Sequence, residues 1–302
     1  MEISFAFWNC AISPPGISDS PQAQLVDDAV SVIKNLLVDK NVSFVALCEV
    51  NEESFALLNE GLSDERFESV LLNDKTKTGS RFDICLFYSA QDVSISEGVS
   101  HTGMVGTSSI KIAQQLEIEV KNNKTKVNFL ISHWPSRLQY VSDSFRNECS
   151  IGLRNFVYGL INDDLQVILM GDYNDDPYSA GLFKNLKATN DRALVLSSTK
   201  GWLYNPFWRE LIAREYFSQD SKDHDFGTCY SKANNRNRWS TFDQIIFSGN
   251  FLQGGPWFLK ESKTGVVTDN SLINMVMSDK HKFDHLPVFG CIEYLEEKNV
   301  QL

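Results

Sequence analysis

Several polar residues stand where apolar stretches of the sequence end. Asn9 closes the stretch at 3–8, Glu49 that at 42–48 and His133 that at 127–132. Each has an ordinary structural explanation, because asparagine forms turns and a lone glutamate or histidine often ends a strand. Together they are harder to explain in that way, since every one falls where strands end and a site could assemble. The full set is Asn9, Glu49, His133, Asp172, Asn174, Asp243, Asp284 and His285.

One of these acids lies inside an apolar stretch. Asp243 stands in TFDQIIFSG, and it requires a partner because a buried unpaired carboxylate is costly. Carboxylate and amide oxygens are the ligands that Mg²⁺ and Mn²⁺ prefer. Such an ion polarises a phosphoryl oxygen, and a histidine with a carboxylate partner orients or activates water. The set therefore predicts hydrolysis of a phosphoester with Mg²⁺ or Mn²⁺ as the cofactor.

Short β-rich stretches must position these side chains. They are predicted at 3–8, 42–50, 83–88, 110–120, 127–134, 166–171, 242–247 and 286–294, and several are continuously apolar, as in strands covered on both faces. One helix is predicted to open at Ser20 with Pro21 in its first position, a second to run from Asn51 to Gly61, and a third to open at Ser142 or Asp143. This alternation predicts a two-sheet α/β sandwich. Because no repeat or linker divides the chain, one domain over residues 1–302 is expected.

The composition narrows the partners and the location. A formal charge of −11 disfavours charge-driven binding to DNA, RNA or anionic membranes, although an enzyme that engages phosphates through a cation remains compatible. No apolar stretch is long enough for a spanning helix, the N-terminus has the pattern of a strand, and no stable membrane association is expected. The six scattered cysteines indicate free thiols in a reducing compartment, so a cytoplasmic location is expected.

Six motifs occur in a characteristic order along the chain. They are FWN at 7–9, LCEVN at 47–51, SHW at 132–134, GDYND at 171–175, FDQIIFS at 242–248 and FDHLPV at 283–288. In this order they resemble the endonuclease/exonuclease/phosphatase superfamily, which includes DNase I, exonuclease III-type abasic endonucleases, neutral sphingomyelinases and inositol polyphosphate 5-phosphatases. The resemblance implies a four-layer α/β sandwich of the DNase I type, with two packed mixed β-sheets flanked by helices. It also implies a site at one edge of that sandwich.

The resemblance implies roles for the metal-binding and water-handling residues. Glu49 is similar to the main Mg²⁺ ligand, with Asn9 beside it. Asp284 is similar to a second carboxylate of the metal or water network. Asp172 resembles the aspartate that orients or deprotonates the attacking water, and Asn174 the asparagine that helps to hold this water and the phosphoryl oxygen.

The two histidines take their roles from the same resemblance. His133 is similar to the histidine that contacts the phosphate or protonates the leaving oxygen. His285 resembles the histidine beside the scissile phosphate, and Asp243 the carboxylate that fixes its tautomer. The chain departs from the family at Phe283, where serine is common, and a change in packing is expected there. Asp83 is one candidate for a further family position near the middle strands, but a plain strand start is the preferred interpretation.

Basic residues near these motifs are candidates for substrate binding. Arginine binds phosphate through two nitrogens, and basic residues interleaved with an aromatic suit nucleic-acid contacts. Surface ion pairs, for Arg137 and Arg146 in particular, and solvated loops are the alternatives. The predicted substrate-binding residues are Arg81, Arg137, Arg236, Arg238 and Trp239.

The leading functional hypothesis is a Mg²⁺-dependent phosphodiesterase acting on nucleic acid. A DNase I-like endonuclease is expected, with DNA ahead of RNA as its substrate. The first alternative keeps the chemistry and changes the substrate to a phosphorylated small molecule or lipid head group. The second alternative, an inactive binding scaffold, fits poorly because the chain keeps the whole polar set.

Overall fold

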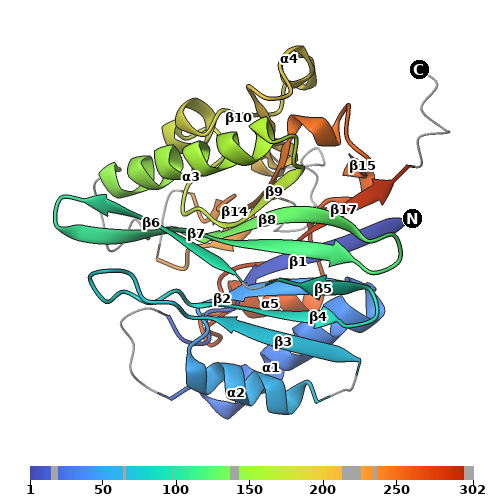
Figure 1. Ribbon diagram of the computed structural model, residues 1–302. Coiled ribbons are helices and arrows are strands. Elements are labelled where there is room, and N and C mark those ends of the chain that lie inside the picture. Colours follow the sequence, from blue (N-terminus) through green and yellow to red (C-terminus); the bar gives the residue numbers. More distant parts are fainter. Residues whose placement is uncertain are drawn as a thin grey trace, which may run out of the picture.

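Two mixed β-sheets stack on each other, with helices on their outer sides (Figure 1). The computed structural model describes residues 1–14, 20–63, 66–96, 98–136, 143–212, 226–233 and 237–295. In the first sheet, β1 and β2 are parallel and the other neighbours are antiparallel. Its order is β15 (Trp257–Leu259), β17 (Val288–Tyr294), β1 (Glu2–Asn9), β2 (Phe44–Cys48), β4 (Ile84–Ser89) and β3 (Phe67–Leu72), with β16 (Gly265–Val266) also on β17.

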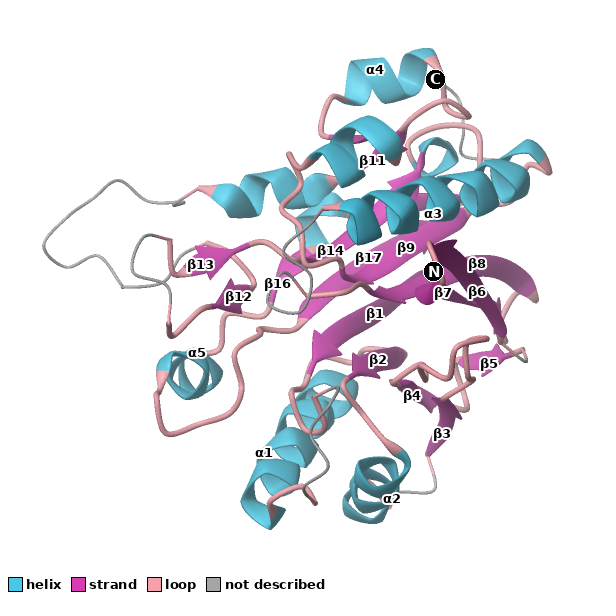
Figure 2. Ribbon diagram, turned by 90° about the vertical axis from the view of Figure 1, so that its left-hand side faces the viewer, coloured by secondary structure: helices cyan, strands magenta, loops and turns pink. Residues whose placement is uncertain are grey.

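The second sheet carries His133, Asp172 and Asp243. Within it β8 and β9 are parallel, as are β10 and β11. Its order is β10 (Ala188–Thr189), β11 (Leu203–Tyr204), β14 (Asp243–Ser248), β9 (Val167–Asp172), β8 (Thr125–His133), β7 (Ser108–Val120) and β5 (Val93–Ile95), with β6 (Val99–Val105) also on β7. A separate ribbon of β12 (Cys229–Tyr230) and β13 (Trp239–Ser240) lies outside the two sheets (Figure 2).

Helices cover the outer side of each sheet (Figures 1 and 2). α1 (Ala23–Lys34), extended by the π-helical turn Asn35–Asp39, and α2 (Glu52–Gly61) lie against the first sheet, with α5 (Asn270–Met277) beside α1. α3 (Ser144–Asn162) covers the second sheet. Shorter helices are α4 (Arg192–Ser197), the π-helical segment Ala180–Asn185 and the 3₁₀ turns Pro206–Leu211, Gly249–Phe251 and Glu261–Lys263.

Aromatic rings hold the two sheets together. Phe129 of β8 lies edge-on to Phe5 of β1 and Phe44 of β2, with 5.0 Å between ring centroids in each pair. All three side chains are buried. Edge-to-face pairs of this kind contribute about 0.5–1.5 kcal/mol each beyond the burial of their area. The ring of Phe129 therefore joins both sheets at the centre of the core.

The same alternation that builds this core also positions the site. Residues two apart on a strand share one face, so the apolar series facing the space between the sheets continues into polar residues at the strand ends. The successive residues are Phe7 and Asn9 on β1, Ile131 and His133 on β8, Met170 and Asp172 on β9, and Ile245 and Asp243 on β14. Pairing sets His133 and Asp243 directly beside Asp172 on either side. Four strands thus deliver polar side chains to one end of the core.

Most of the predicted elements are confirmed. All eight predicted strands are present, with ends within two residues of the prediction. α2 is capped by Asn51, whose side chain accepts from Ser54 N in a capping box. Asp143 occupies the N-cap position of α3, as predicted, but its side chain makes no capping hydrogen bond. The predicted start of α1 is wrong, because Gln22 occupies the cap position and Pro21 precedes it. The fold class is confirmed, while the extent of one domain over 1–302 stays a prediction.

Removing the ring that joins the sheets tests this description of the core. Phe129→Ala should lower the free energy of unfolding by about 3–5 kcal/mol, because it leaves a cavity between Phe5 and Phe44. Urea unfolding followed by circular dichroism measures the change. Val99→Ala is the control, since Val99 is exposed on β6, and it should cost less than about 0.5 kcal/mol. Equal losses in both variants would contradict the assignment of Phe129 to the core.

Candidate active site

A row of three polar side chains crosses from one sheet to the other. Asn9, at the end of β1, donates from Nδ2 to Glu49 Oε1 at 3.2 Å and to Asp172 Oδ2 at 3.0 Å. Its own Oδ1 accepts from the backbone N–H of Ala11 at 3.1 Å, which fixes the orientation of the amide. Glu49 directly follows β2, and Asp172 ends β9. Asn9 therefore holds together two carboxylates that come from different sheets.

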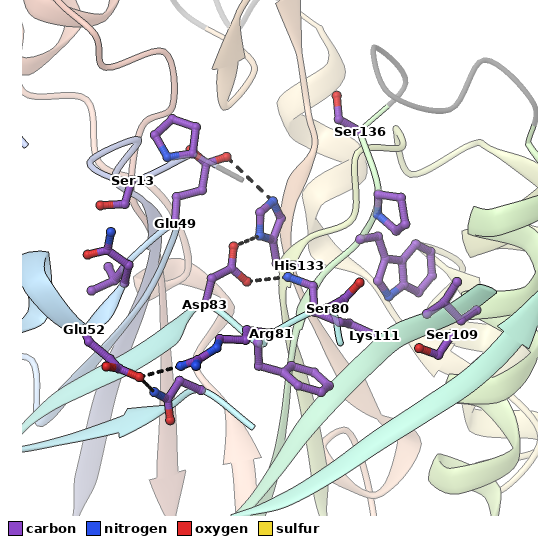
Figure 3. Close-up of a pocket in the computed structure, with 18 of the residues that line it drawn as sticks. Ser13, Glu49, Glu52, Ser80, Arg81, Asp83, Ser109, Lys111, His133 and Ser136 are labelled. Carbon is purple, nitrogen blue, oxygen red and sulfur yellow. Dashed lines mark hydrogen bonds and ion pairs between the residues drawn. The ribbon is translucent and has the colours of Figure 1, made fainter. Parts of the chain in front are cut away.

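One histidine–carboxylate pair lies at the Glu49 end of this row (Figure 3). His133 Nδ1 lies 2.8 Å from Asp83 Oδ2, and His133 Nε2 lies 3.8 Å from Glu49 Oε1. The second carboxylate oxygen of Asp83 accepts from Lys111 Nζ at 2.7 Å. With Nδ1 held by the carboxylate, Nε2 is the nitrogen that faces Glu49 and the cavity beside it.

A second histidine–carboxylate pair lies at the Asp172 end. His285 Nδ1 lies 2.7 Å from Asp243 Oδ2. Its Nε2 is 3.8 Å from Asp172 Oδ2 and 3.9 Å from Asp284 Oδ1. The backbone carbonyl of His285 accepts from Trp8 Nε1 at 3.0 Å, which ties this segment to β1. The predicted pairing of Asp243 with His285 is present, and it gives the buried acid its partner.

Electrostatics keep the first pair charged. Burial alone would raise the pKa of Asp83, but the nearby His133 and Lys111 outweigh it and hold that pKa well below its usual range. Burial likewise disfavours the imidazolium of His133, yet the attraction of Asp83 raises the pKa of His133. A histidine whose pKa is raised in this way keeps a proton that it can donate.

Burial and mutual attraction act against each other in the second pair. Burial raises the pKa of Asp243, with the charge of His285 acting in the opposite direction. Burial would lower the pKa of His285, but Asp243 raises it well above the ordinary value. Because the two groups interact this strongly, their titration belongs to the pair rather than to either residue.

Two residues of the site have a positive φ, a backbone conformation that residues other than glycine rarely adopt. Glu49 has φ of 61° and Asn174 has φ of 50°. Such conformations cost on the order of 1–3 kcal/mol each and persist only where the surroundings enforce them. Here the Glu49 carbonyl accepts from Ser13 N at 2.8 Å, and Asn174 N donates to Asp172 Oδ1 at 2.8 Å. The turns after β2 and β9 are therefore held in the form that presents these side chains.

The GDYND turn is anchored from two further directions. Asn174 Nδ2 donates to the Trp134 carbonyl at 2.9 Å, which joins the turn after β9 to the residue after β8. Arg146 of α3 is 1% exposed, and its Nε lies 3.5 Å from Asp175 Oδ1. The guanidinium also pairs with Asp143. Arg146 is thus a buried anchor of the site, which departs from the surface ion pair given as its alternative.

A cavity of about 880 Å³ opens beside Glu49 and His133 (Figure 3). Its wall carries hydroxyl, amide and acidic side chains together with aromatic edges. Among the described lining residues, Lys111 is paired with Asp83 and Arg81 with Glu52. The lining residues are Ser13, Pro14, Glu49–Glu53, Asn73, Ser80–Asp83, Ser109–Lys111, His133–Ser136 and Phe145. The cavity therefore adjoins the first histidine pair, and the second pair does not line it.

The polar row has the donors that a divalent cation requires. In the described part of the chain, ligand atoms of Asp172, Asp243 and His285 lie within 4.8 Å of one another. Burial raises the pKa of Glu49, so this carboxylate lacks full compensation for its charge. A cation between Glu49 and Asp172 would supply it. Asn9 turns its amide nitrogen toward both acids and bridges them, while its part in holding a metal stays a prediction.

The predicted substrate-binding residues do not lie together at one surface. Trp239, a predicted substrate-binding residue, is buried against Tyr230, with 5.0 Å between ring centroids, so its ring is not exposed for contact with a substrate. Arg238 is exposed and donates to Tyr230 Oη at 2.8 Å. Arg81 lines the cavity but pairs with Glu52. Arg137 and Arg236 lie outside the described residues.

Two residues of the site were not identified as such from the sequence. For Asp83 the sequence favours a plain strand start over a role in the site, and it suggests no role for Lys111. The sequence places Asp83 before an apolar strand, where an acid is ordinary. Lys111 interrupts the apolar pair Ile110 and Ile112, and this was the sequence signal that could have identified it. The signal is ambiguous, because a solvated lysine on a strand with alternating faces gives the same pattern.

The comparisons with known proteins agree with this fold and identify the family. The sequence model described as Endonuclease/Exonuclease/phosphatase family matches residues 20–297. The chain therefore belongs to this family, whose members hydrolyse phosphoesters, as the order of motifs predicted. No curated protein matches the sequence. Among the described residues, no helix has the length and apolar character to cross a membrane.

Three solved structures show the shared fold. An endonuclease/exonuclease/phosphatase family protein from Bacteroides thetaiotaomicron has 16% identity and a TM-score of 0.63, over 98% of this chain and 99% of that one. The human Nocturnin catalytic domain with bound sulfate has 14% identity and a TM-score of 0.62, over 97% and 95%. A mannosyl-6-phosphatase from Bacteroides thetaiotaomicron has 15% identity and a TM-score of 0.61, over 97% and 100%. At these identities the likeness establishes the fold alone.

Metal binding can be tested without any substrate. Mn²⁺ or Mg²⁺ should raise the melting temperature, since a ligand present at 100 times its Kd stabilises by about 2.7 kcal/mol. Glu49→Gln should remove most of this rise because it removes a buried anionic donor. Glu52→Gln is the matched control, since Glu52 lines the same cavity but pairs with Arg81, and it should keep the rise. An equal rise in both variants would place the cation elsewhere.

Proposed function

We propose that this protein is a Mg²⁺- or Mn²⁺-dependent phosphodiesterase that cleaves nucleic acid, with DNA as the first substrate to test. One observation carries the phosphoesterase chemistry: two histidine–carboxylate pairs stand at opposite ends of the Glu49–Asn9–Asp172 row. The cation would be held by Glu49 and Asp172, with Asp284 near it. When bound, it supplies positive charge that polarises the phosphoryl oxygen.

The chain's own side chains carry out the remaining steps. One group acts on the attacking water, and the other acts on the leaving oxygen at the opposite side of phosphorus. Asp172 orients the attacking water and takes its proton, while Asn174 helps to hold that water. The water oxygen forms the new bond to phosphorus, and the bond from phosphorus to the leaving oxygen breaks. The leaving oxygen keeps the electron pair and receives a proton from His133 Nε2. His285, held by Asp243, stabilises the charge that develops on the phosphoryl group.

The position of the cavity indicates on which side of phosphorus the leaving group lies. In-line displacement places the attacking water and the leaving group on opposite sides of phosphorus. The cavity adjoins His133 and Glu49, so the body of the leaving group belongs on that side. Asp172 and His285 lie at the other end of the row, which suits the water.

The nucleic-acid substrate has two supports. The motif set in its family order is the first. The second is Arg238, which is exposed on the β12–β13 ribbon, and this ribbon reaches the site through the bond from Tyr230 N to the Asp284 carbonyl at 2.7 Å. A cation there would meet the backbone of a strand that crosses the site. The free cysteines fit the expected cytoplasmic location, which stays a prediction.

A second candidate function is favoured by the cavity. A volume of about 880 Å³ falls in the range of small-molecule sites. Glu52 and Glu53 add negative charge to its wall, and Glu52 cancels the charge of Arg81. Such a wall suits a compact, hydroxyl-rich body with one phosphate better than a polyanion. One of the similar structures is a mannosyl-6-phosphatase, which is consistent with a phosphorylated small molecule here.

Plasmid nicking is the first activity test. Wild-type protein should convert supercoiled plasmid to the nicked form with Mg²⁺ or Mn²⁺ and not with EDTA. His285→Ala should lose about 10²–10³-fold of this rate, because removing one group that stabilises charge in the transition state typically costs that much. His101→Ala is the matched control, since His101 lies on β6 and bonds to Gln115. Nicking that survives EDTA, or full activity in His285→Ala, would contradict the proposal.

The charge of the cavity wall can be tested with small substrates. Glu52→Gln should free Arg81 and lower the KM for glucose 1,6-bisphosphate relative to glucose 6-phosphate by about two- to fivefold, the range expected for an exposed pair. Steady-state phosphate release measures both values. Glu53→Gln removes the same charge from the same cavity, so a matching shift there would show that Arg81 is not responsible.

A further inference from the structure

The two histidine–carboxylate pairs are not equivalent. Asp83 uses both carboxylate oxygens, Oδ2 at 2.8 Å from His133 Nδ1 and Oδ1 at 2.7 Å from Lys111 Nζ. Asp243 uses Oδ2 for His285, while its Oδ1 has no hydrogen-bond partner within the described part of the structure. Only the pair beside the cavity therefore carries a third, cationic member among the described residues.

Lys111 comes from the strand next to the one that carries His133. β7 and β8 run antiparallel, and their register places Gln114 opposite Ile131, so Lys111 and His133 both lie just beyond this paired stretch. Asp83 comes from the other sheet, just before β4. Both partners of this carboxylate thus reach across from the second sheet, and they hold it from two sides (Figure 3).

The burial of this ion pair distinguishes it from the other pair on the cavity wall. The side chains of Lys111 and Asp83 are 18% and 13% exposed, against 49% and 66% for Arg81 and Glu52. Exposed ion pairs contribute little, whereas loss of one partner of a buried pair leaves an uncompensated charge. The Lys111–Asp83 contact is therefore a built part of the site rather than a surface pair.

We propose that Lys111 is a positioning residue for His133. By occupying Oδ1 of Asp83, it holds the carboxylate so that Oδ2 stays on His133 Nδ1 and Nε2 stays aimed at the leaving oxygen. The proposal rests on the proposed function, in which the bond from phosphorus to the leaving oxygen breaks and that oxygen takes its proton from Nε2. The residue acts through His133 and touches no reacting atom.

The dependence on the leaving group tests this role. Thymidine 5′-phosphate p-nitrophenyl ester releases a phenol that needs little protonation, whereas the unsubstituted phenyl ester needs more. Lys111→Met should lower kcat on the phenyl ester at least about tenfold more than on the p-nitrophenyl ester, with KM unchanged. His133→Ala should show the same dependence, and the double variant should be no worse than His133→Ala alone. Lys111→Arg should restore part of the difference.

Two results of this assay would overturn the proposal. Equal losses on both esters would mean that Lys111 does not act on protonation of the leaving group. A rise in KM alone would make Lys111 a substrate-binding residue. If the wild-type protein with Mg²⁺ or Mn²⁺ cleaves neither ester and does not nick plasmid, it is the proposed phosphodiesterase function that fails.

Imidazole ¹⁵N spectra test the positioning independently of activity. At a pH where His133 is neutral, its remaining proton should stay on Nδ1 as a single tautomer in the wild-type protein, and Lys111→Met should give a mixture of the two tautomers. The signals of His285 serve as an internal control for folding, because its partner Asp243 has no contact with Lys111, and they should not change. An unchanged His133 spectrum in a folded Lys111→Met protein would overturn the proposal.

Discussion

The contact on which the site depends is the one that Asn9 makes with two carboxylates. Glu49 and Asp172 come from different sheets, and the amide nitrogen of Asn9 donates to both. Without this donor, two partly buried negative charges would face each other across the junction of the sheets. The packing of the two sheets against each other thus has two results. It buries Phe129 between them, and it brings the carboxylates of the site together at the end of the core.

The site has a direction because its two ends differ. The Asp83–His133 end adjoins the cavity and carries Lys111, whereas the Asp243–His285 end lies against Asp172 and Asp284. The two pairs are similar in composition, but their surroundings suit them to different roles. One suits proton delivery to a departing oxygen, and the other suits the phosphoryl group and the attacking water.

Charge is distributed in a way that fits a cation-dependent enzyme. The chain has a formal charge of −11, and the described cations beside the cavity are cancelled by acids. In the proposed function, attraction for a phosphate comes mainly from a cation bound at the Glu49–Asp172 row. The strained backbone at Glu49 and Asn174 serves this row, since both turns place polar groups that a relaxed strand end would direct elsewhere.

The sequence by itself determined the strands, the family and the polar residues at the strand ends. It did so because alternation along a strand is local, and because six ordered motifs are specific in combination. The resemblance already implied that Asp243 serves His285, but only the tertiary structure decided that Asp83 serves His133. Asp83 lies 50 residues from His133, and an acid before a strand has the same local pattern whether solvated or paired. The burial of Trp239 and the pairing of Arg81 were likewise decided by neighbours distant in sequence, because exposure and charge compensation depend on packing rather than on residue type.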